Sequence, residues 1–184
     1  MSRINVFFAN GFEEIEGLTV IDLLRRAGLE VDMVSINEEL EVIGAHNIVI
    51  KADRLLSEID FEEGDMIVLP GGMPGTINLG ECKVLTDNIV KYNNEKKMIS
   101  AICAAPSILG KLGVLKGKSA TCYPGFEDQL MDAAYLNSGV VKSSNIITAN
   151  GMGTAIDFGL AIIEHYLGKG KAKSIADAIQ YKVN

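Results

Sequence analysis

The stretch ISAICAAPSIL, residues 99–109, contains a short apolar run, a cysteine and the start of a helix. The apolar run MISAI is typical of a buried strand. Pro106 suits the first turn of a helix, where a missing N–H group costs nothing. The stretch therefore predicts a strand that passes through a tight turn at Cys103 directly into a helix.

The same alternation continues in both directions along the chain. Buried-strand patterns occur at residues 4–9, 30–36, 65–72 and 98–102, and helical spacing occurs at 14–28, 84–97, 105–113, 126–136, 153–168 and 172–182. Shorter strand patterns follow, with a hairpin expected at 41–53 and brief strands at 118–123 and 139–150. Strands that alternate with helices predict a parallel sheet covered on both faces. We expect a single domain over residues 1–184.

Composition excludes several classes of protein. Hydrophobic residues make up 48% of the chain and charged residues 22%, as in an ordered globular protein. The net charge of −7 argues against a nucleic-acid partner. Three cysteines and two histidines without metal-ligand spacing predict no bound metal, no disulfide framework and a reducing compartment. With no signal peptide or membrane span, we expect a cytoplasmic protein without a membrane partner.

In parallel sheets, ligands bind beside the carboxyl ends of the strands. This rule selects the loops NGFEE, LPGGMPGT, ICAAP and ANGMGT. In ICAAP, Cys103 lies where the positive end of a helix dipole favours a thiolate, and the turn would raise its side chain above the sheet. The alternative is an inert buried cysteine, which describes most cysteines in proteins. Position alone leaves the two interpretations about equally good.

The glycines of LPGGMPG, residues 69–75, could present backbone N–H groups to an anion or a developing oxyanion. The loop lacks the Lys-Ser/Thr pair of a phosphate-binding loop, so we do not expect nucleotide hydrolysis. In GMGTAI, Ile156 occupies the third glycine position of a dinucleotide fingerprint, which argues against that cofactor. Ordinary turn chemistry would explain either loop taken alone.

Three glutamates open the first helix, and acids there commonly interact with the helix dipole. Glu16 lies about one turn into the helix, and a carboxyl group facing a thiolate in a dry pocket would have its pKa raised. A protonated Glu16 could then donate a hydrogen bond to sulfur. Glu13 and Glu14 are expected to be solvated.

The remaining candidates carry weaker signals. Neither histidine is placed to act as a base for Cys103, and His46 is expected at the surface or in an interface. Cys82 is interpreted as a residue at the start of a helix, and Cys122 as structural. Tyr123 follows a short strand whose end should open toward the same edge as Cys103.

Together, four motifs resemble the ThiJ/PfpI superfamily, and within it the branch of the Parkinsonism-associated deglycase. These motifs, in chain order, are GFEEIEGLTVIDLLRRAG, DMIVLPGGMPG, ISAICAAPSIL and ANGMGTAIDFGLAII. The resemblance covers nearly the whole chain. It implies a flavodoxin-like three-layer α/β sandwich with a mostly parallel central sheet, like that of class I glutamine amidotransferases. It also implies a homodimer and no cofactor.

By the same resemblance, Cys103 is the reactive cysteine and Glu16 is the buried acid that hydrogen-bonds it. Gly72 and Ala104 supply backbone donors on the oxyanion side. The further pocket residues implied are Gly71, Tyr123 and His46. The chain departs from the family at two of these, because Tyr123 replaces a histidine near the cysteine and His46 replaces an arginine that crosses the dimer. The first change argues against strong peptidase activity.

Two functions fit these residues. In the first, the Cys103 thiolate attacks a reactive carbonyl, such as methylglyoxal, glyoxal or an early glycation adduct, in detoxification or repair. In the second, the chain is a redox-sensing protective protein or chaperone whose Cys103 oxidises to a sulfinate, with little turnover. The same cysteine–acid pair would serve both.

Overall fold

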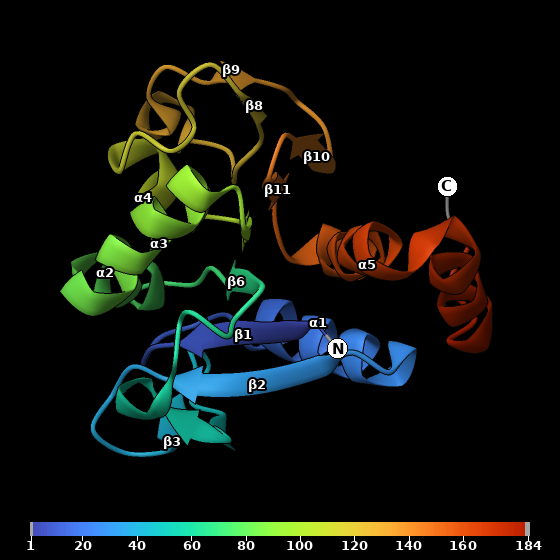
Figure 1. Ribbon diagram of the computed structural model, residues 1–184, viewed down its shortest axis with the longest axis horizontal. Helices are drawn as coiled ribbons and strands as arrows, with labels where there is room; N and C mark the ends of the chain where they lie inside the picture. The colour runs from blue at the N-terminus through green and yellow to red at the C-terminus, as the bar shows by residue number, and fades with distance from the viewer. Residues whose placement is uncertain (1, 183–184) are drawn as a thin grey trace.

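The computed structural model describes residues 2–182 and places a seven-stranded sheet at the centre of the molecule (Figure 1). The strand order is β10-β11-β7-β6-β1-β2-β5. All neighbouring strands are parallel except β10 and β11, which form an antiparallel pair. The bounds are β1 (Arg3–Phe8), β2 (Glu30–Ser35), β5 (Arg54–Leu55), β6 (Met66–Leu69), β7 (Met98–Ile102), β10 (Val140–Ser143) and β11 (Ile146–Ala149).

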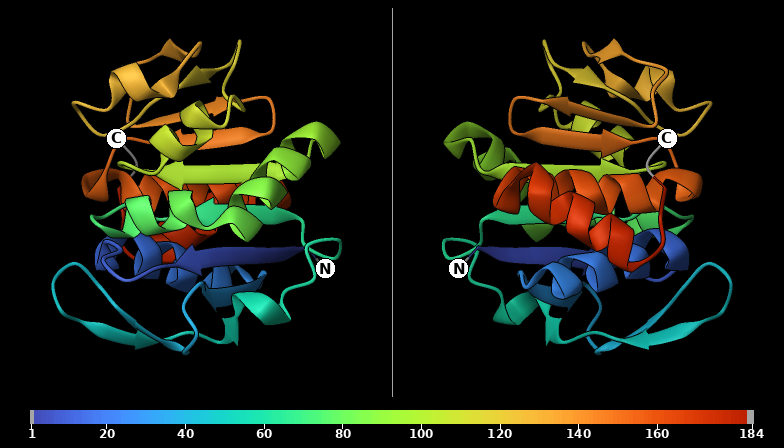
Figure 2. Two further views of the ribbon diagram at one scale, coloured as in Figure 1. Left: turned by 90° about the vertical axis from the view of Figure 1, so that its left-hand side faces the viewer. Right: turned by 90° about the vertical axis from the view of Figure 1, so that its right-hand side faces the viewer.

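Helices cover both faces of this sheet, as the two side views in Figure 2 show. One face carries α1 (Glu14–Ala27) and α5 (Ala155–Ala178), which bends at Gly168. The other face carries α2 (Gly75–Glu81), α3 (Lys83–Glu95) and α4 (Pro106–Lys111). The 3₁₀ turns are η1 (Leu56–Glu58), η2 (Glu127–Leu130) and η3 (Met152–Thr154), and the small ribbons are β3 (Glu41–Ile43) with β4 (Val49–Lys51) and β8 (Ser119–Ala120) with β9 (Ala134–Tyr135).

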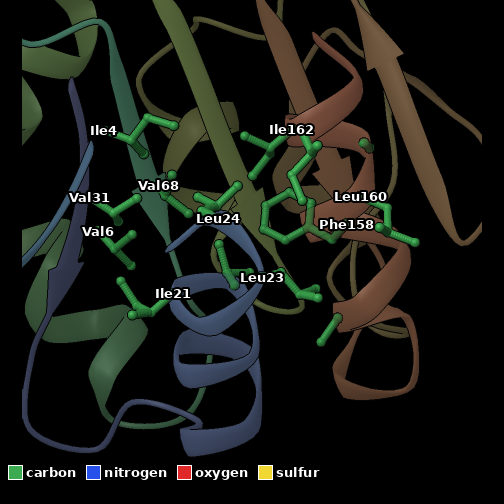
Figure 3. Packing of buried hydrophobic residues seen from close by; sticks show 14 of the residues in the cluster. Ile4, Val6, Ile21, Leu23, Leu24, Val31, Val68, Phe158, Leu160 and Ile162 are labelled. Atoms are coloured by element: carbon green, nitrogen blue, oxygen red, sulfur yellow. The ribbon is translucent and has the colours of Figure 1, made fainter. Parts of the chain in front are cut away.

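Two hydrophobic cores lie on opposite faces of the sheet. Val6 packs toward α1 and α5, in the cluster that contains Leu24 and Phe158 (Figure 3). Its neighbour Phe7 packs into the other cluster, under α2, α3 and α4. Because successive side chains of a strand point to opposite faces, a strand covered on both sides is apolar at every position. The two covered faces explain why residues 4–9 are apolar at every position except Asn5.

The structure confirms the predicted strands and the hairpin at 41–53, and it corrects two helices. Residues 126–136 do not form a helix: η2 is followed by the short strand β9. Met131 and Asp132 have positive φ angles, which end any helix, and Leu130 alone in η2 is buried. Conversely, α2 was not predicted, because a proline and two glycines hide its helical spacing.

The fold brings the four selected loops to one edge. β1, β6, β7 and β11 are parallel neighbours, so the segments after their carboxyl ends meet there. In residues 2–182, no helix is long and apolar enough to cross a membrane.

Candidate active site

Cys103 occupies a strained turn directly after β7. Its φ angle is 64°, a left-handed conformation that non-glycine residues rarely adopt. The Cys103 N–H donates to Ala149 O (2.9 Å), and Cys103 O accepts from the Tyr123 N–H (2.8 Å). These bonds tie the residue to the neighbouring strand and to the segment that follows β8. The turn leaves the side chain half-buried at the strand edge, as the sequence predicts.

Two backbone N–H groups hydrogen-bond the Cys103 sulfur, and they belong to Gly72 and Ala104. Ala104 reaches the sulfur because it follows Cys103 in the turn. Gly72 has a φ angle of +90°, and a Cβ atom there would lie 2.2 Å from the Glu13 nitrogen. Only glycine fits this position. The structure thus brings the two predicted donors to one atom.

Glu16 on α1 lies beside this sulfur and is 1% exposed. Its Oε2 accepts a hydrogen bond from the Gly71 N–H (2.8 Å), and its carboxyl group shares a hydrogen bond with Cys103. Its Oε1 is buried and has no hydrogen-bond partner within the described residues. A Cβ atom on Gly71 would lie 2.7 Å from both Cys103 Cβ and Glu16 Oε2. A glycine at position 71 therefore lets the acid and the cysteine meet.

Glu14 is buried, contrary to the expectation that it is solvated. Its Oε1 accepts from the His46 N–H (2.8 Å), and its Oε2 lies 2.8 Å from His46 Nδ1. The hairpin of β3 and β4 covers this carboxylate, and Gly44 makes room, because a Cβ atom there would lie 2.2 Å from Glu14 Oε1. Glu13 is half-buried, with Oε2 3.7 Å from His46 Nδ1. His46 is thus an exposed partner of its own chain's Glu14.

A family model described as DJ-1/PfpI family matches residues 2–165. The chain belongs to the DJ-1/PfpI family. It is 38% identical to Protein DJ-1 homolog B of Arabidopsis thaliana over 99% of this chain, yet it spans only 42% of that relative's length. It is 34% identical to the Glutathione-independent glyoxalase DJR-1.2 of Caenorhabditis elegans, over 89% of this chain and 87% of the relative.

Among solved structures, oxidized Toxoplasma gondii DJ-1 superposes with a TM-score of 0.95 at 36% identity, and each chain is covered completely. This likeness confirms the predicted fold, a flavodoxin-like three-layer sandwich with a mostly parallel sheet.

In this DJ-1/PfpI chain, the electrostatics of Cys103 differ from the prediction made from its position. Burial raises the pKa of the Cys103 thiol to about 12, and the charge of Glu16 adds to the rise. The Ala104 and Gly72 N–H groups act in the opposite direction but are outweighed. The helix dipole contributes little because α4 begins only at Pro106 and is six residues long.

Burial also raises the pKa of Glu16 to about 7, which the sequence does predict. Two groups that interact this strongly titrate as a pair. The pair loses its first proton near pH 7, and the second is retained to much higher pH. The retained proton is shared between the Glu16 carboxyl group and the Cys103 sulfur. In the main singly protonated form this proton is on the Cys103 sulfur, and the thiolate is the minor form, in which the proton is on Glu16.

The other predicted residues lie as follows. Tyr123 is 49% exposed at the same edge, with its ring against Gly151. Cys122 is fully buried, as a structural cysteine would be, and Cys82 directly precedes α3, without a capping hydrogen bond from its side chain. The burial of Glu14 was not predicted from the sequence. Gly44 and His46, in the hairpin that covers Glu14, are the residues that could have indicated it. Glu13, Glu14 and His46 each place one ligand atom within 4.8 Å of the others, but the His46–Glu14 pair already satisfies these groups.

Proposed function

We propose that this chain acts on reactive carbonyls, such as methylglyoxal, glyoxal or early glycation adducts, with Cys103 as the nucleophile. The observation that carries the proposal is one sulfur facing three groups: the Glu16 carboxyl and the N–H groups of Gly72 and Ala104. The name of the nematode relative, a glutathione-independent glyoxalase, supports the same class of substrate.

The geometry supports the following steps with methylglyoxal. The pair's thiolate form adds to the aldehyde carbon, forming a C–S bond, and the carbonyl oxygen becomes an oxyanion. The Gly72 and Ala104 N–H groups are placed to meet that charge, and the Glu16 proton is placed to neutralise it. A proton then moves from the former aldehyde carbon to the ketone carbon through an enediol, which leaves a lactate thioester. Water hydrolyses the thioester and restores the thiol. The internal transfer balances the electrons, so no external oxidant is needed.

A homodimer is part of this proposal. Exposed apolar side chains gather on α1 and on the β3–β4 hairpin, namely Ile15, Leu18, Ile43, Ile48 and Val49. Exposed apolar side chains on neighbouring elements are typical of interaction sites. Sedimentation of the purified protein would test this part separately.

Lactate formation tests the enzymatic proposal. The wild-type protein incubated with methylglyoxal should release D- or L-lactate, and Cys103→Ser should lower the rate at least a hundredfold. Cys122→Ser is the matched control, because Cys122 is fully buried in the core under α2, α3 and α4, whereas Cys103 packs against the core under α1 and α5. Equal rates for the wild type and Cys103→Ser would reject a cysteine mechanism.

A second candidate function is redox sensing by the same residue. The half-buried Cys103 has backbone donors and a neighbouring acid that could stabilise a sulfinate, and the similar Toxoplasma gondii structure is of an oxidized protein. After mild peroxide, peptide mass spectrometry should find Cys103 oxidised before Cys82 and Cys122. Earlier oxidation of either other cysteine would sink this candidate.

A further inference from the structure

A groove of about 480 Å³ lies between α2 and α4 on the face of the sheet opposite α1. Its volume is in the range of small-molecule binding sites. The middle of the groove is apolar, with walls formed by Ile77, Gly80, Ile108 and Leu112. None of the site residues described above lines it.

One end of the groove is built on the segments that surround the reactive sulfur. Met73 follows the donor Gly72. Ser107 donates its N–H to Ala104 O (3.0 Å), and Phe126 donates its N–H to Tyr123 O (3.1 Å). Met73, Ser107 and Phe126 all line the groove. A ligand in the groove therefore has one end beside the loops that hold Cys103.

Polar residues also line the groove. Thr76 lines it, is 5% exposed, and has a buried hydroxyl without a hydrogen-bond partner among residues 2–182. At the other end lie Glu81 and Lys111, the last residues of α2 and α4. Both are exposed, and neither forms a salt bridge within the described part of the chain. At 1.5 Å per residue, α2 separates its two ends by about 9 Å.

We propose that this groove is a second subsite, which holds the body of a substrate whose carbonyl adduct reaches Cys103. The apolar middle fits an unbranched methylene stem, and the charges at the far end fit a zwitterionic head. Glu81 would bind an α-ammonium group and Lys111 an α-carboxylate. The ligand class is thus a free amino acid with a long side chain that ends in the adduct, as in a lysine modified at its side-chain nitrogen. The subsite rests on the proposed function for its place in a reaction, although its binding is testable alone.

Gly80 allows a sharp test of the groove. A Cβ atom at this position would meet only the Ile108 side chain, at 3.5 Å or more. Gly80→Leu therefore places its bulk in the groove without a clash with the backbone. Gly170→Leu on α5 is the matched control, because a Cβ atom there meets nothing within 4 Å. Both replacements also improve helix propensity.

Binding is measured by NMR titration with Nε-acetyl-lysine, a stable probe, on Cys103→Ser protein so that no chemistry intervenes. We expect saturable binding that weakens at least tenfold in Gly80→Leu and stays unchanged in Gly170→Leu. Glu81→Gln and Lys111→Gln should each weaken it severalfold, and so should a probe capped at both α groups. Equal binding to Gly80→Leu would overturn the subsite, and equal binding of the capped probe would overturn the recognition of a zwitterion.

A kinetic arm separates this subsite from the proposed function. With Cys103 intact, the ratio of kcat/KM for the lysine–methylglyoxal adduct to that for free methylglyoxal should fall at least tenfold in Gly80→Leu. An unchanged ratio would overturn the subsite while leaving the carbonyl chemistry standing. Absence of lactate from wild-type protein would instead refute the proposed function, and the probe titration would still decide whether the groove binds.

Discussion

Replacing Glu16 by glutamine should change how the stability of the protein depends on pH. Burial raises the pKa of Glu16 from 4.5 to about 7. The native state thus keeps this proton at pH values where the unfolded chain has lost it. The stability that the protonated acid contributes is complete below pH 4.5 and is lost as the pH rises through 7. At about 1.4 kcal/mol per pH unit, the whole loss is about 3 kcal/mol.

The amide introduced by Glu16→Gln cannot ionise, yet its oxygen can still accept from the Gly71 N–H. The variant should therefore escape this loss. Because the isoelectric point is about 4.9, unfolding is best followed between about pH 5.5 and 8, away from the least soluble range. In that window the free energy of urea unfolding of the wild type should fall by about 2 kcal/mol relative to Glu16→Gln.

Glu38→Gln is the matched control, because Glu38 is exposed in the loop after β2. Its pH profile should follow the wild type. Identical pH profiles for the wild type and Glu16→Gln would refute the conclusion that this carboxyl group is buried in its protonated form. They would also remove the acid that the proposed mechanism requires.

Three further predictions concern the surroundings of this acid. The rate of Cys103 alkylation by iodoacetamide should rise near pH 7, where the Glu16–Cys103 pair loses its first proton. A rate that rises only above about pH 10 would contradict a shared proton. Gly72→Ala should cost about 3 kcal/mol or more in urea unfolding, because its Cβ would lie 2.2 Å from backbone, whereas Gly113→Ala, at φ +73° in open space, should cost about 1 kcal/mol. The hydrogen bond to Glu14 raises the pKa of His46. His46→Asn should therefore lose the full stabilisation of this pair below pH 6.5, and it should be as stable as the wild type once the pH exceeds the raised pKa. A destabilisation that does not change with pH would contradict an ion pair.

The parallel sheet was predictable because its strands are buried on both faces. Residues 4–9 and 98–102 are apolar at nearly every position, and the amphipathic segments between strands can only be helices that cover a sheet. The prediction of a helix at 126–136 was wrong. The apolar residues of this segment suggested one buried helical face, but the segment does not bury such a face. The positive φ angles at Met131 and Asp132 turn the segment away instead.

The sequence predicted which residues form the site, but it did not predict the pKa of Cys103. Cys103 and Glu16 could be paired from the motifs around them. The direction in which the pKa of Cys103 is shifted could not be predicted. It depends on how much of the chain covers the sulfur, and the sequence does not show this. The burial of Glu14 was equally hidden, since it depends on a distant hairpin that begins at Glu41 and on the missing side chain of Gly44.

The burial of Glu16 and Cys103 depends on the packing of the hydrophobic core beneath them. α1 is held against α5 by close packing: a Cβ atom on Gly159 would lie 2.7 Å from Leu23 Cδ1, so the glycine lets the helices approach without displacing the Leu23 side chain. The neighbouring side chains Leu24, Phe158 and Ile162 fill the space between the helices and the sheet (Figure 3). That packing excludes water from the inner side of α1, where Glu16 lies, and exclusion of water is what raises its pKa. The proton available to a substrate at neutral pH therefore depends on contacts that no substrate touches.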